Sequence, residues 1–322
     1  MLTAPHAWTN PSPDPVSFAH AFTATFASLE RLRRSFTEPG VLLAAVRGGG
    51  ELQAYAHLPP DGGHVVIGRH PRCDLRVGAD PSVGLRHAVV AVRCRGDALG
   101  VQVWTLGAVD GVWTEDGRHF ATLVSEGSSC FAIGRVHVFA LVTGPSALPW
   151  STDGATTWAD LRARVVVNGV RFPVGRAPSF DLDDPTALVD DVRTGLRVRA
   201  TRGSGEVIGV LRIGNGLGQA HVPVTDHGLE RGVMLGRADR CDVGGRFATL
   251  SRLHALLVRR DGAPWILDTA SRNGLLLGAT PVRQARLDHG TTVQLGGPIA
   301  IAWHAVGDDD GVAEVGHEPG GE

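Results

Sequence analysis

The sequence of 322 residues contains no lysine, so its 31 basic residues are all arginine, and no basic run occurs among them. The net charge is −2 at pH 7. Nonspecific binding to nucleic acid depends on clustered positive charge that displaces counterions from the phosphates. The composition therefore argues against a nucleic-acid-binding protein. The use of arginine alone is typical of a GC-rich bacterial genome and is not itself evidence of function.

Cysteine is also scarce. The four cysteines are Cys73, Cys94, Cys130 and Cys241, and none lies at metal-ligand spacing from another. This pattern predicts buried, reduced thiols in a cytoplasmic protein, with no disulfide framework and no metal site. No apolar run is long enough to span a bilayer, and the N-terminus lacks the basic start and apolar core of a signal peptide. We therefore expect no membrane partner.

Common catalytic motifs are missing as well. The sequence has no Gly-x-Ser-x-Gly elbow and no His-Glu-x-x-His pair. Residues 214–218 (GNGLG) look like a nucleotide-binding loop, but the strand-like HVPV follows where a helix N-terminus would be needed. A hairpin turn is the better interpretation. We expect no catalytic residues and no cofactor.

What the sequence does contain is a pattern of polar clusters between residues 236 and 274. The clusters are Gly236-Arg237, residues 251–254 (SRLH) and residues 271–274 (SRNG). Apolar runs of strand length separate them, at 255–258 and 265–267. The clusters therefore fall in loops at strand ends, where β-sandwich proteins usually carry their binding groups.

The residue types in these clusters suit a phosphorylated peptide. A phosphate dianion needs several donors that converge on one point, and Arg237 offers a planar fork that fits two phosphate oxygens. Ser251 adds a short hydroxyl donor, and Arg252 adds a second positive charge. Asn273 carries a donor and an acceptor, so it suits a peptide backbone better than a charge.

In their order and spacing, followed by Gly296, the clusters resemble the forkhead-associated (FHA) domain, a β-sandwich whose loops bind phosphothreonine in an extended peptide. The resemblance implies that Arg237 and Ser251 hold the phosphate and that Asn273 grips the main chain after the phosphothreonine. The sequence departs from many family members at Arg272, which stands where they carry Thr or Ser; it either adds phosphate affinity or points into solvent. The resemblance also implies a set of structural residues in the loops, namely Gly236, His254, Ser271 and Gly274.

The N-terminal part repeats this pattern. Residues 65–75 (VVIGRHPRCDL) match 233–243 (VMLGRADRCDV), and 84–90 (GLRHAVV) match 251–257 (SRLHALL). The repeat has its own Arg69 and His87, so we expect a second FHA-like sandwich.

The site of this second copy looks damaged. In the alignment of the two repeats, Gly84 is equivalent to Ser251, and Asp110 is equivalent to Asn273. The carboxylate of Asp110 would repel a phosphate bound at this site. Arg69 and Arg86 retain positive charge, and Ser82 is a possible substitute for the missing hydroxyl. We expect a degenerate copy that has lost phosphate binding.

The expected fold class is all-β, with two FHA-type antiparallel β-sandwiches, an N-terminal helix and a small β insert between the sandwiches. The expected boundaries are a disordered N-terminus at 1–14, an amphipathic helix at 15–38, the degenerate sandwich at 40–143, an insert at 144–205, the FHA domain at 206–306 and an acidic disordered tail at 307–322.

The helix carries an apolar stripe that contains Phe18, Phe22, Phe26 and Leu29. We interpret this stripe as packing against the following sandwich, with docking of a partner as the alternative.

Two features of the insert lead to hypotheses. Asn168-Gly169 predicts a hairpin turn between two strands. The run Thr157-Trp158-Ala159-Asp160, in a segment that we expect to be an accessible loop, places an acidic residue three positions after a threonine, a spacing that many FHA ligands share. If Thr157 is phosphorylated, the chain can bind to itself; the alternative is that Trp158 is packed and Thr157 is never modified.

The function that these patterns favour is a cytoplasmic adaptor that binds phosphothreonine through its C-terminal FHA domain, downstream of a Ser/Thr kinase. The alternative is a scaffold protein that uses FHA-like sandwiches for contacts that do not depend on phosphate. An enzyme is a third and weaker reading, because no cluster of catalytic residues is evident.

Overall fold

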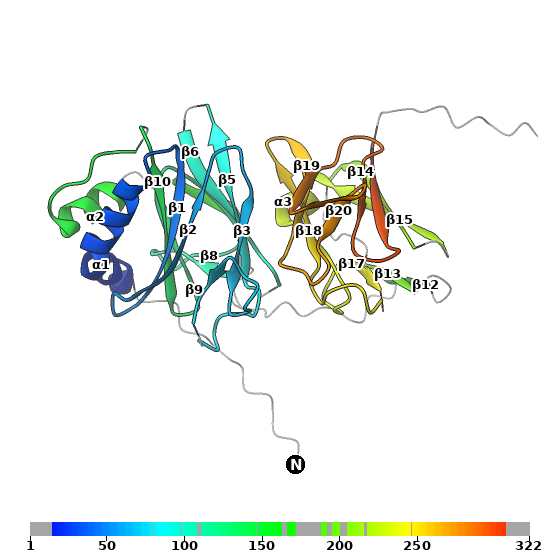
Figure 1. Cartoon of the computed structure of the whole chain (residues 1–322), viewed down its shortest axis with the longest axis horizontal. Helices are drawn as coiled ribbons and strands as arrows, with labels where there is room; N and C mark the ends of the chain where they lie inside the picture. Colours follow the sequence, from blue (N-terminus) through cyan, green and yellow to red (C-terminus); the bar gives the residue numbers. More distant parts are fainter. Residues whose placement is uncertain are drawn as a thin grey trace, which may run out of the picture.

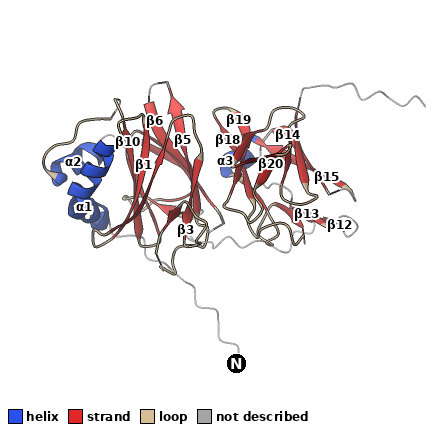
Figure 2. Ribbon diagram, in the orientation of Figure 1, coloured by secondary structure: helices blue, strands red, loops and turns tan. Residues whose placement is uncertain are grey.

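The computed structural model describes residues 15–78, 80–96, 98–107, 111–145, 147–162, 166–171, 188–191, 195–199, 205–215, 218–245 and 247–306. These residues form two β-sandwiches that lie against each other, with two helices on the outer side of the N-terminal sandwich (Figures 1 and 2). The expected disordered segments, 1–14 and 307–322, lie outside the described residues. Within the ranges above, no helix has the length and apolar character that crossing a membrane requires.

The N-terminal sandwich is one strongly curved sheet in the order β2-β1-β10-β9-β7-β8-β6-β5-β3-β4, with β11 paired to β8. Its strands are β1 (Gly40–Arg47), β2 (Leu52–Leu58), β3 (His64–Gly68), β4 (Leu75–Arg76), β5 (Ala88–Arg95), β6 (Ala98–Thr105), β7 (Val112–Trp113), β8 (His119–Glu126), β9 (Ser129–Ile133), β10 (Val136–Thr143) and β11 (Val166–Arg171). The short strand β7 pairs with both β8 and β9 and so joins the two layers.

The C-terminal sandwich has two separate sheets, in the orders β12-β13-β17-β16-β18-β19-β22 and β15-β14-β24-β23-β20-β21. The strands are β12 (Leu188–Asp191), β13 (Leu196–Arg199), β14 (Val207–Gly214), β15 (Gln219–Thr225), β16 (Val233–Leu235), β17 (Val243–Gly245), β18 (Ala255–Arg260), β19 (Ala263–Asp268), β20 (Leu275–Leu277), β21 (Thr280–Val282), β22 (Gln284–Arg286), β23 (Thr292–Gln294) and β24 (Ala300–Ala305). A short helix, α3 (Asp226–Arg231), precedes β16. The antiparallel pairing of β14 with β15 confirms the predicted hairpin at 214–218.

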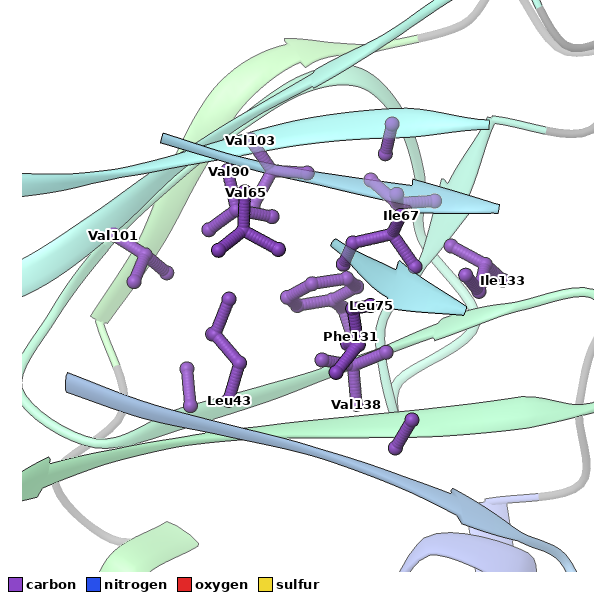
Figure 3. Close-up of a cluster of buried hydrophobic side chains, with 14 of the residues drawn as sticks. Leu43, Val65, Ile67, Leu75, Val90, Val101, Val103, Phe131, Ile133 and Val138 are labelled. Carbon is purple, nitrogen blue, oxygen red and sulfur yellow. The ribbon is translucent and has the colours of Figure 1, made fainter. Parts of the chain in front are cut away.

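The all-β architecture follows from the alternation of side chains along the strands, which sends every second residue into the space between layers. In the N-terminal sandwich this space is filled mainly by branched aliphatic side chains, together with Phe120 and Phe131. Figure 3 shows part of this core around Phe131. Strand β1 shows why some runs are apolar throughout: Leu43 points into this core, while Leu42 and Ala44 point to the opposite face.

That opposite face is covered by α1 (Pro15–Ser35) and α2 (Gly154–Arg162). Phe18, Phe22 and Leu29 of α1 are fully buried against β1 and β10, and Phe22 also contacts Trp158 of α2, with ring centroids 5.2 Å apart. The apolar stripe of the N-terminal helix is therefore packed against the following sandwich, as the first interpretation predicted, and is not open for a partner.

The insert differs from the sequence-based prediction in two ways. The predicted hairpin at Asn168-Gly169 is wrong: both residues lie inside β11, opposite Val124 and Leu123 of β8. The segment adds a strand to the available edge of β8, and pairing with an existing strand satisfies more backbone groups than an isolated hairpin.

The predicted loop around residue 157 is a helix, α2. Thr157 is 2% exposed and its Oγ1 donates to the carbonyl oxygen of Asp153 at 2.9 Å, while Trp158 is 8% exposed. A kinase needs an exposed, extended threonine, so the structure favours the packed alternative over phosphorylation of Thr157 and self-recognition.

The two sandwiches share a buried apolar interface, formed by the outer face of β3, β5 and β6 and the outer face of β16, β18 and β19. Its buried members are Val66, Cys73, Val89, Ala91, Trp104 and Leu106 from the N-terminal side, and Cys241, Leu253, Leu256, Val258, Leu267 and Ala270 from the C-terminal side. Trp104 is fully buried in it. A contact of this kind stabilises one fixed arrangement of the two units.

The interface uses equivalent positions of both sandwiches. Val89 pairs with Trp104 across β5 and β6, and Leu256 pairs with Leu267 across β18 and β19. Each pair faces the other sandwich. Equivalent patches of the two sandwiches therefore contact each other around a pseudo-two-fold axis, as in the isologous interface of a homodimer.

Polar contacts fix the register of this interface. The Nε2 atom of His64 lies 2.6 Å from the carbonyl oxygen of Asp268, and Arg283 forms a salt bridge with Asp74 at 2.7 Å. Arg72 and Arg86 also reach across, to carbonyl groups in the loop that carries Asn273, as described below.

The interface predicts the reactivity of two thiols. Burial raises the pKa of Cys73 to about 11 and that of Cys241 to about 12. Because the thiolate is the reactive form, neither thiol should react with iodoacetamide at neutral pH in the folded protein, whereas the exposed Cys94 should react. Mass spectrometry of the alkylated protein would locate the label, with denatured protein as the control. Rapid labelling of Cys73 or Cys241 in the folded chain would contradict the packed interface.

Candidate functional site

The candidate site is built where three loops of the C-terminal sandwich converge. The loop after β16 lies against the loop before β18: the backbone N–H of Arg237 donates to the carbonyl oxygen of Ser251, and that of Ala238 donates to Arg252, both at 3.0 Å. Gly236 permits this approach, since a Cβ there would lie 2.4 Å from the carbonyl oxygen of Arg252. The motif glycine is thus explained by contact between two backbones.

His254 ties the second loop to the third. It is fully buried, its Nδ1 accepts from the N–H of Ser251 at 3.2 Å, and its Nε2 lies 2.9 Å from the carbonyl oxygen of Gly274. Since Nδ1 accepts, Nε2 carries the proton and donates. Burial lowers the pKa of His254 and so favours this neutral form. The imidazole is a brace between two loops.

The third loop, residues 268–274, is held by its own hydrogen bonds. The N–H of Ser271 donates to the Asp268 carboxylate at 3.2 Å, and the N–H of Gly274 donates to Oγ of Ser271 at 2.9 Å. Gly274 has φ of +68°, a left-handed conformation that glycine adopts without steric cost. Asn273, directly before Gly274, is exposed, and its Nδ2 donates to the carbonyl oxygen of Thr249 at 2.8 Å.

Ser251 connects these loops and still has a proton to give. Its Oγ accepts from the backbone N–H of Arg272 at 2.8 Å. A hydroxyl has one proton and two lone pairs, so this bond uses a lone pair and leaves the proton available to an incoming acceptor.

A pocket of about 350 Å³ opens at these loops. Its lining includes Ser251 and Thr249 and five arginines, which are Arg72, Arg86, Arg237, Arg252 and Arg272. None of the described residues that line it is a carboxylate. Five like charges around one opening create a strongly positive potential, which attracts an anion. We call this opening the composite pocket, because Arg72 and Arg86 come from the N-terminal sandwich.

The structure brings together most of the residues predicted to bind a phosphopeptide. Arg237, Ser251, Arg252 and Arg272 all line the composite pocket. Asn273 lies on the same loop as Arg272 but is not among the lining residues, and its amide is bonded to Thr249. The four predicted structural residues, Gly236, His254, Ser271 and Gly274, do not line the pocket. They make the contacts described above, which hold the three loops together.

Sequence reasoning missed the contribution of the N-terminal sandwich. Arg86 was expected to leave positive charge at its own site, but its Nη2 donates to the carbonyl oxygen of Ala270 at 2.6 Å and its Nη1 to that of Leu253 at 3.4 Å. Arg72 donates through Nη1 to the carbonyl oxygen of Ser271 at 2.9 Å. No local motif marks these arginines, although the apolar runs at 88–92 and 255–258 do signal burial on both faces.

The corresponding loops of the N-terminal sandwich are arranged differently. His87 repeats the brace, since its Nδ1 accepts from Gly84 and its Nε2 lies 2.8 Å from the carbonyl oxygen of Gly111. Arg69, however, is half-buried and its Nε donates to the carbonyl oxygen of Val83 at 2.5 Å.

The hydroxyl of Ser82, which the sequence offers in place of the missing serine, already has a hydrogen-bond partner. Ser82 Oγ donates to the Asp80 carboxylate at 2.6 Å, so its proton is already used. Asp110, the residue in the place of Asn273, lies outside the described residues.

The lining of the composite pocket suits an anion. Guanidinium groups and a serine hydroxyl are donors that suit phosphate oxygens. In the part of the chain that the structure describes, no group of three or more His, Cys, Asp or Glu side chains is placed to hold a metal ion.

Comparison with known proteins identifies the domain that carries this site. Residues 233–296 match the family model of the FHA domain, and this range contains all of the C-terminal loop residues discussed above. No curated protein matches the chain.

Solved structures, among them FHA domains, are similar to about a third of the chain. FHA-1 of Rv1747 from Mycobacterium tuberculosis is 25% identical, over 30% of this chain and 97% of that one, with a TM-score of 0.26. The FHA domain of CT664 from Chlamydia trachomatis is 22% identical, over 32% and 96%, with a TM-score of 0.27. EmbR of M. tuberculosis, solved with a low-affinity phosphopeptide, is 20% identical, over 30% and 24%, with a TM-score of 0.26.

Proposed function

We propose that this protein is an adaptor whose C-terminal FHA domain binds phosphothreonine in a partner protein. The observation that carries the proposal is the convergence of Arg237, Ser251 and Arg252 on one open pocket. The two guanidinium groups supply charge, and the Ser251 hydroxyl supplies a proton that no described group uses. The match of residues 233–296 to the FHA family supports the same reading.

The role of Asn273 in this proposal is to bind the peptide main chain. Its Nδ2 is bonded to Thr249, while the side-chain oxygen remains for a backbone N–H of the ligand. The side chain is exposed at the edge of the site, where an extended peptide has access to it.

We further propose that the N-terminal sandwich is a degenerate FHA copy that has lost its own phosphate site. In support, Gly84 has no hydroxyl, Ser82 is bonded to Asp80, and Arg69 is turned toward the backbone of Val83. The source of the ligand would be a Ser/Thr kinase acting on the partner, and the proposed site of action is the cytoplasm.

A phosphothreonine-peptide library, screened with the intact protein, tests the proposal. We expect a subset of phosphopeptides to bind, and the same sequences without phosphate to bind far more weakly. Equal binding of both forms would favour the alternative, a scaffold protein whose contacts do not depend on phosphate.

Selectivity between phosphorylated residues gives a second test. A matched phosphothreonine peptide should bind more tightly than its phosphoserine version, because the extra methyl group contributes about 1 kcal/mol when it is buried. β-Branching also restricts the side chain to fewer rotamers, so less freedom is lost on binding. Titration calorimetry with the two peptides measures the difference. Indistinguishable affinities would argue against a site of FHA type.

A further inference from the structure

The N-terminal sandwich supplies one wall of the composite pocket. His70, Arg72 and Arg86 line the same opening as Arg237 and Arg252. These residues come from the loops after β3 and before β5, which the buried interface holds against the C-terminal sandwich. The N-terminal sandwich therefore contributes charged residues to the site of the C-terminal sandwich.

The Asp268 carboxylate acts electrostatically on Arg86, but no carboxylate in the described part of the chain is in salt-bridge contact with this wall. Neither Arg72 nor Arg86 forms a salt bridge there; their hydrogen bonds go to backbone carbonyl groups. Arg86 is half-buried and its Nε is inaccessible, but Nη1 and Nη2 each donate only one of their two protons to a carbonyl group. Arg72 is exposed and uses only one of the five N–H groups of its guanidinium. Both arginines have donors left for a ligand.

The number of arginines also exceeds what one phosphate requires. A phosphothreonine carries a charge of about −1.5 to −2, which Arg237 and Arg252 can balance. Three further arginines, Arg72, Arg86 and Arg272, surround the same opening. Like charges in one pocket repel each other, and a second anion would relieve this repulsion.

We propose that the composite pocket recognises a phosphothreonine peptide that carries a second anionic group, and that Arg72 and Arg86 of the N-terminal sandwich bind this group. The inference rests on the proposed function of the C-terminal site and adds to it a ligand class. The second group is a carboxylate side chain or a second phosphate, since both present oxygen atoms that a guanidinium binds in the same way. Neither sandwich alone contains the complete site.

A simpler role for Arg72 and Arg86 is to position the loop that carries Asn273. Ala270, whose carbonyl accepts from Arg86, has φ of +59°, a conformation that is costly for alanine. A positioning role alone would affect all phosphopeptides equally. A binding role would affect those with a second anion more, and this difference makes the two roles separable.

The test uses the intact protein and four peptides of one sequence. The first has phosphothreonine and neutral flanks, the second has acidic flanks, the third has a second phosphate, and the fourth has no phosphate. Calorimetry measures the affinity of each peptide. The readout is the affinity of the second or third peptide divided by the affinity of the first. We expect a gain of about 3- to 10-fold for the wild-type protein.

In Arg72→Gln this ratio should fall to about one, while Arg72→Lys, which keeps the charge, should retain part of it. The matched control is Arg240→Gln. Arg240 occupies the position equivalent to Arg72 but lies near Gly107 on the other side of the pseudo-two-fold axis, and it does not line the composite pocket. Its replacement removes the same charge and should leave the ratio unchanged. Melting temperatures of all variants check that they are folded.

The possible outcomes separate the two proposals. The composite site is overturned if neither the peptide with acidic flanks nor the peptide with a second phosphate binds more tightly than the first peptide. It is also overturned if Arg72→Gln weakens the binding of all phosphopeptides equally. Either result leaves the proposed phosphothreonine site in place. Failure of every phosphopeptide to bind overturns both. A gain with the second phosphate alone, lost in Arg72→Gln, supports the inference and identifies the ligand as doubly phosphorylated.

Discussion

Replacing Arg237 with alanine should weaken the binding of a phosphothreonine peptide about 10- to 200-fold. A charge-assisted hydrogen bond to phosphate contributes roughly 1.5–3 kcal/mol, and the bidentate geometry of arginine places Arg237 at the upper part of this range. The side chain is exposed, and the contact of its loop with Ser251 is made by backbone atoms. The fold should therefore survive the change, and titration calorimetry with an unchanged melting temperature would attribute the loss to the site.

The matched control for this prediction is Arg69→Ala. Arg69 has the equivalent position in the N-terminal repeat, but its Nε is bonded to the backbone of Val83 and it does not line the composite pocket. Its removal should leave phosphopeptide affinity almost unchanged. Equal affinity of Arg237→Ala and the wild type would refute the assignment of the site, and a larger loss in Arg69→Ala would mean that the N-terminal copy is the active one.

The second large effect is expected from Trp104→Ala, which should lower the free energy of unfolding by about 3–5 kcal/mol. Substitution of a buried Trp by Ala removes apolar burial and leaves a cavity that the surroundings fill only in part. Trp104 is fully buried between the sandwiches, where it lies beside Gly232 and Leu256 of the C-terminal one. Chemical denaturation with calorimetry as a second method would measure the change.

Because Trp104 belongs to the interface, its loss should also loosen the contact between the sandwiches. Cys73 and Cys241 should then react with iodoacetamide faster than in the wild-type protein. The control is Trp113→Ala, since Trp113 is half-buried on the opposite face under α1 and α2. That variant should lose less stability and leave both thiols protected. Unchanged stability and thiol protection in Trp104→Ala would show that the sandwiches do not depend on this contact.

Much of the C-terminal site could be predicted from the sequence alone. The order of Arg237, Ser251, His254 and Asn273 indicates three loops at strand ends, because polar clusters alternate with apolar runs of strand length. The repeat of the same pattern around Arg69 and His87 likewise indicates a second sandwich. These inferences are possible because strand periodicity and loop composition are local properties of a chain.

Local sequence properties predicted the wrong secondary structure where contacts with another element determined the conformation of a segment. Asn168-Gly169 favours a turn, but the edge of β8 pairs with this segment and keeps it extended. The stretch around Thr157 contains turn residues, yet Trp158 packs against Phe22 and Phe139 as part of a helix. Tertiary packing outweighed propensity in both places.

Only the tertiary structure decided which residues share the pocket. Arg72 and Arg86 precede Arg237 by more than a hundred residues, and no pattern near them predicts a role in the site of the other repeat. They reach it because Trp104 and its apolar neighbours bury the outer faces of both sandwiches against each other. The free energy of that burial depends on two complementary surfaces that form only after each sandwich has folded. The sequence of either repeat, taken alone, therefore cannot reveal the wall that the other one provides.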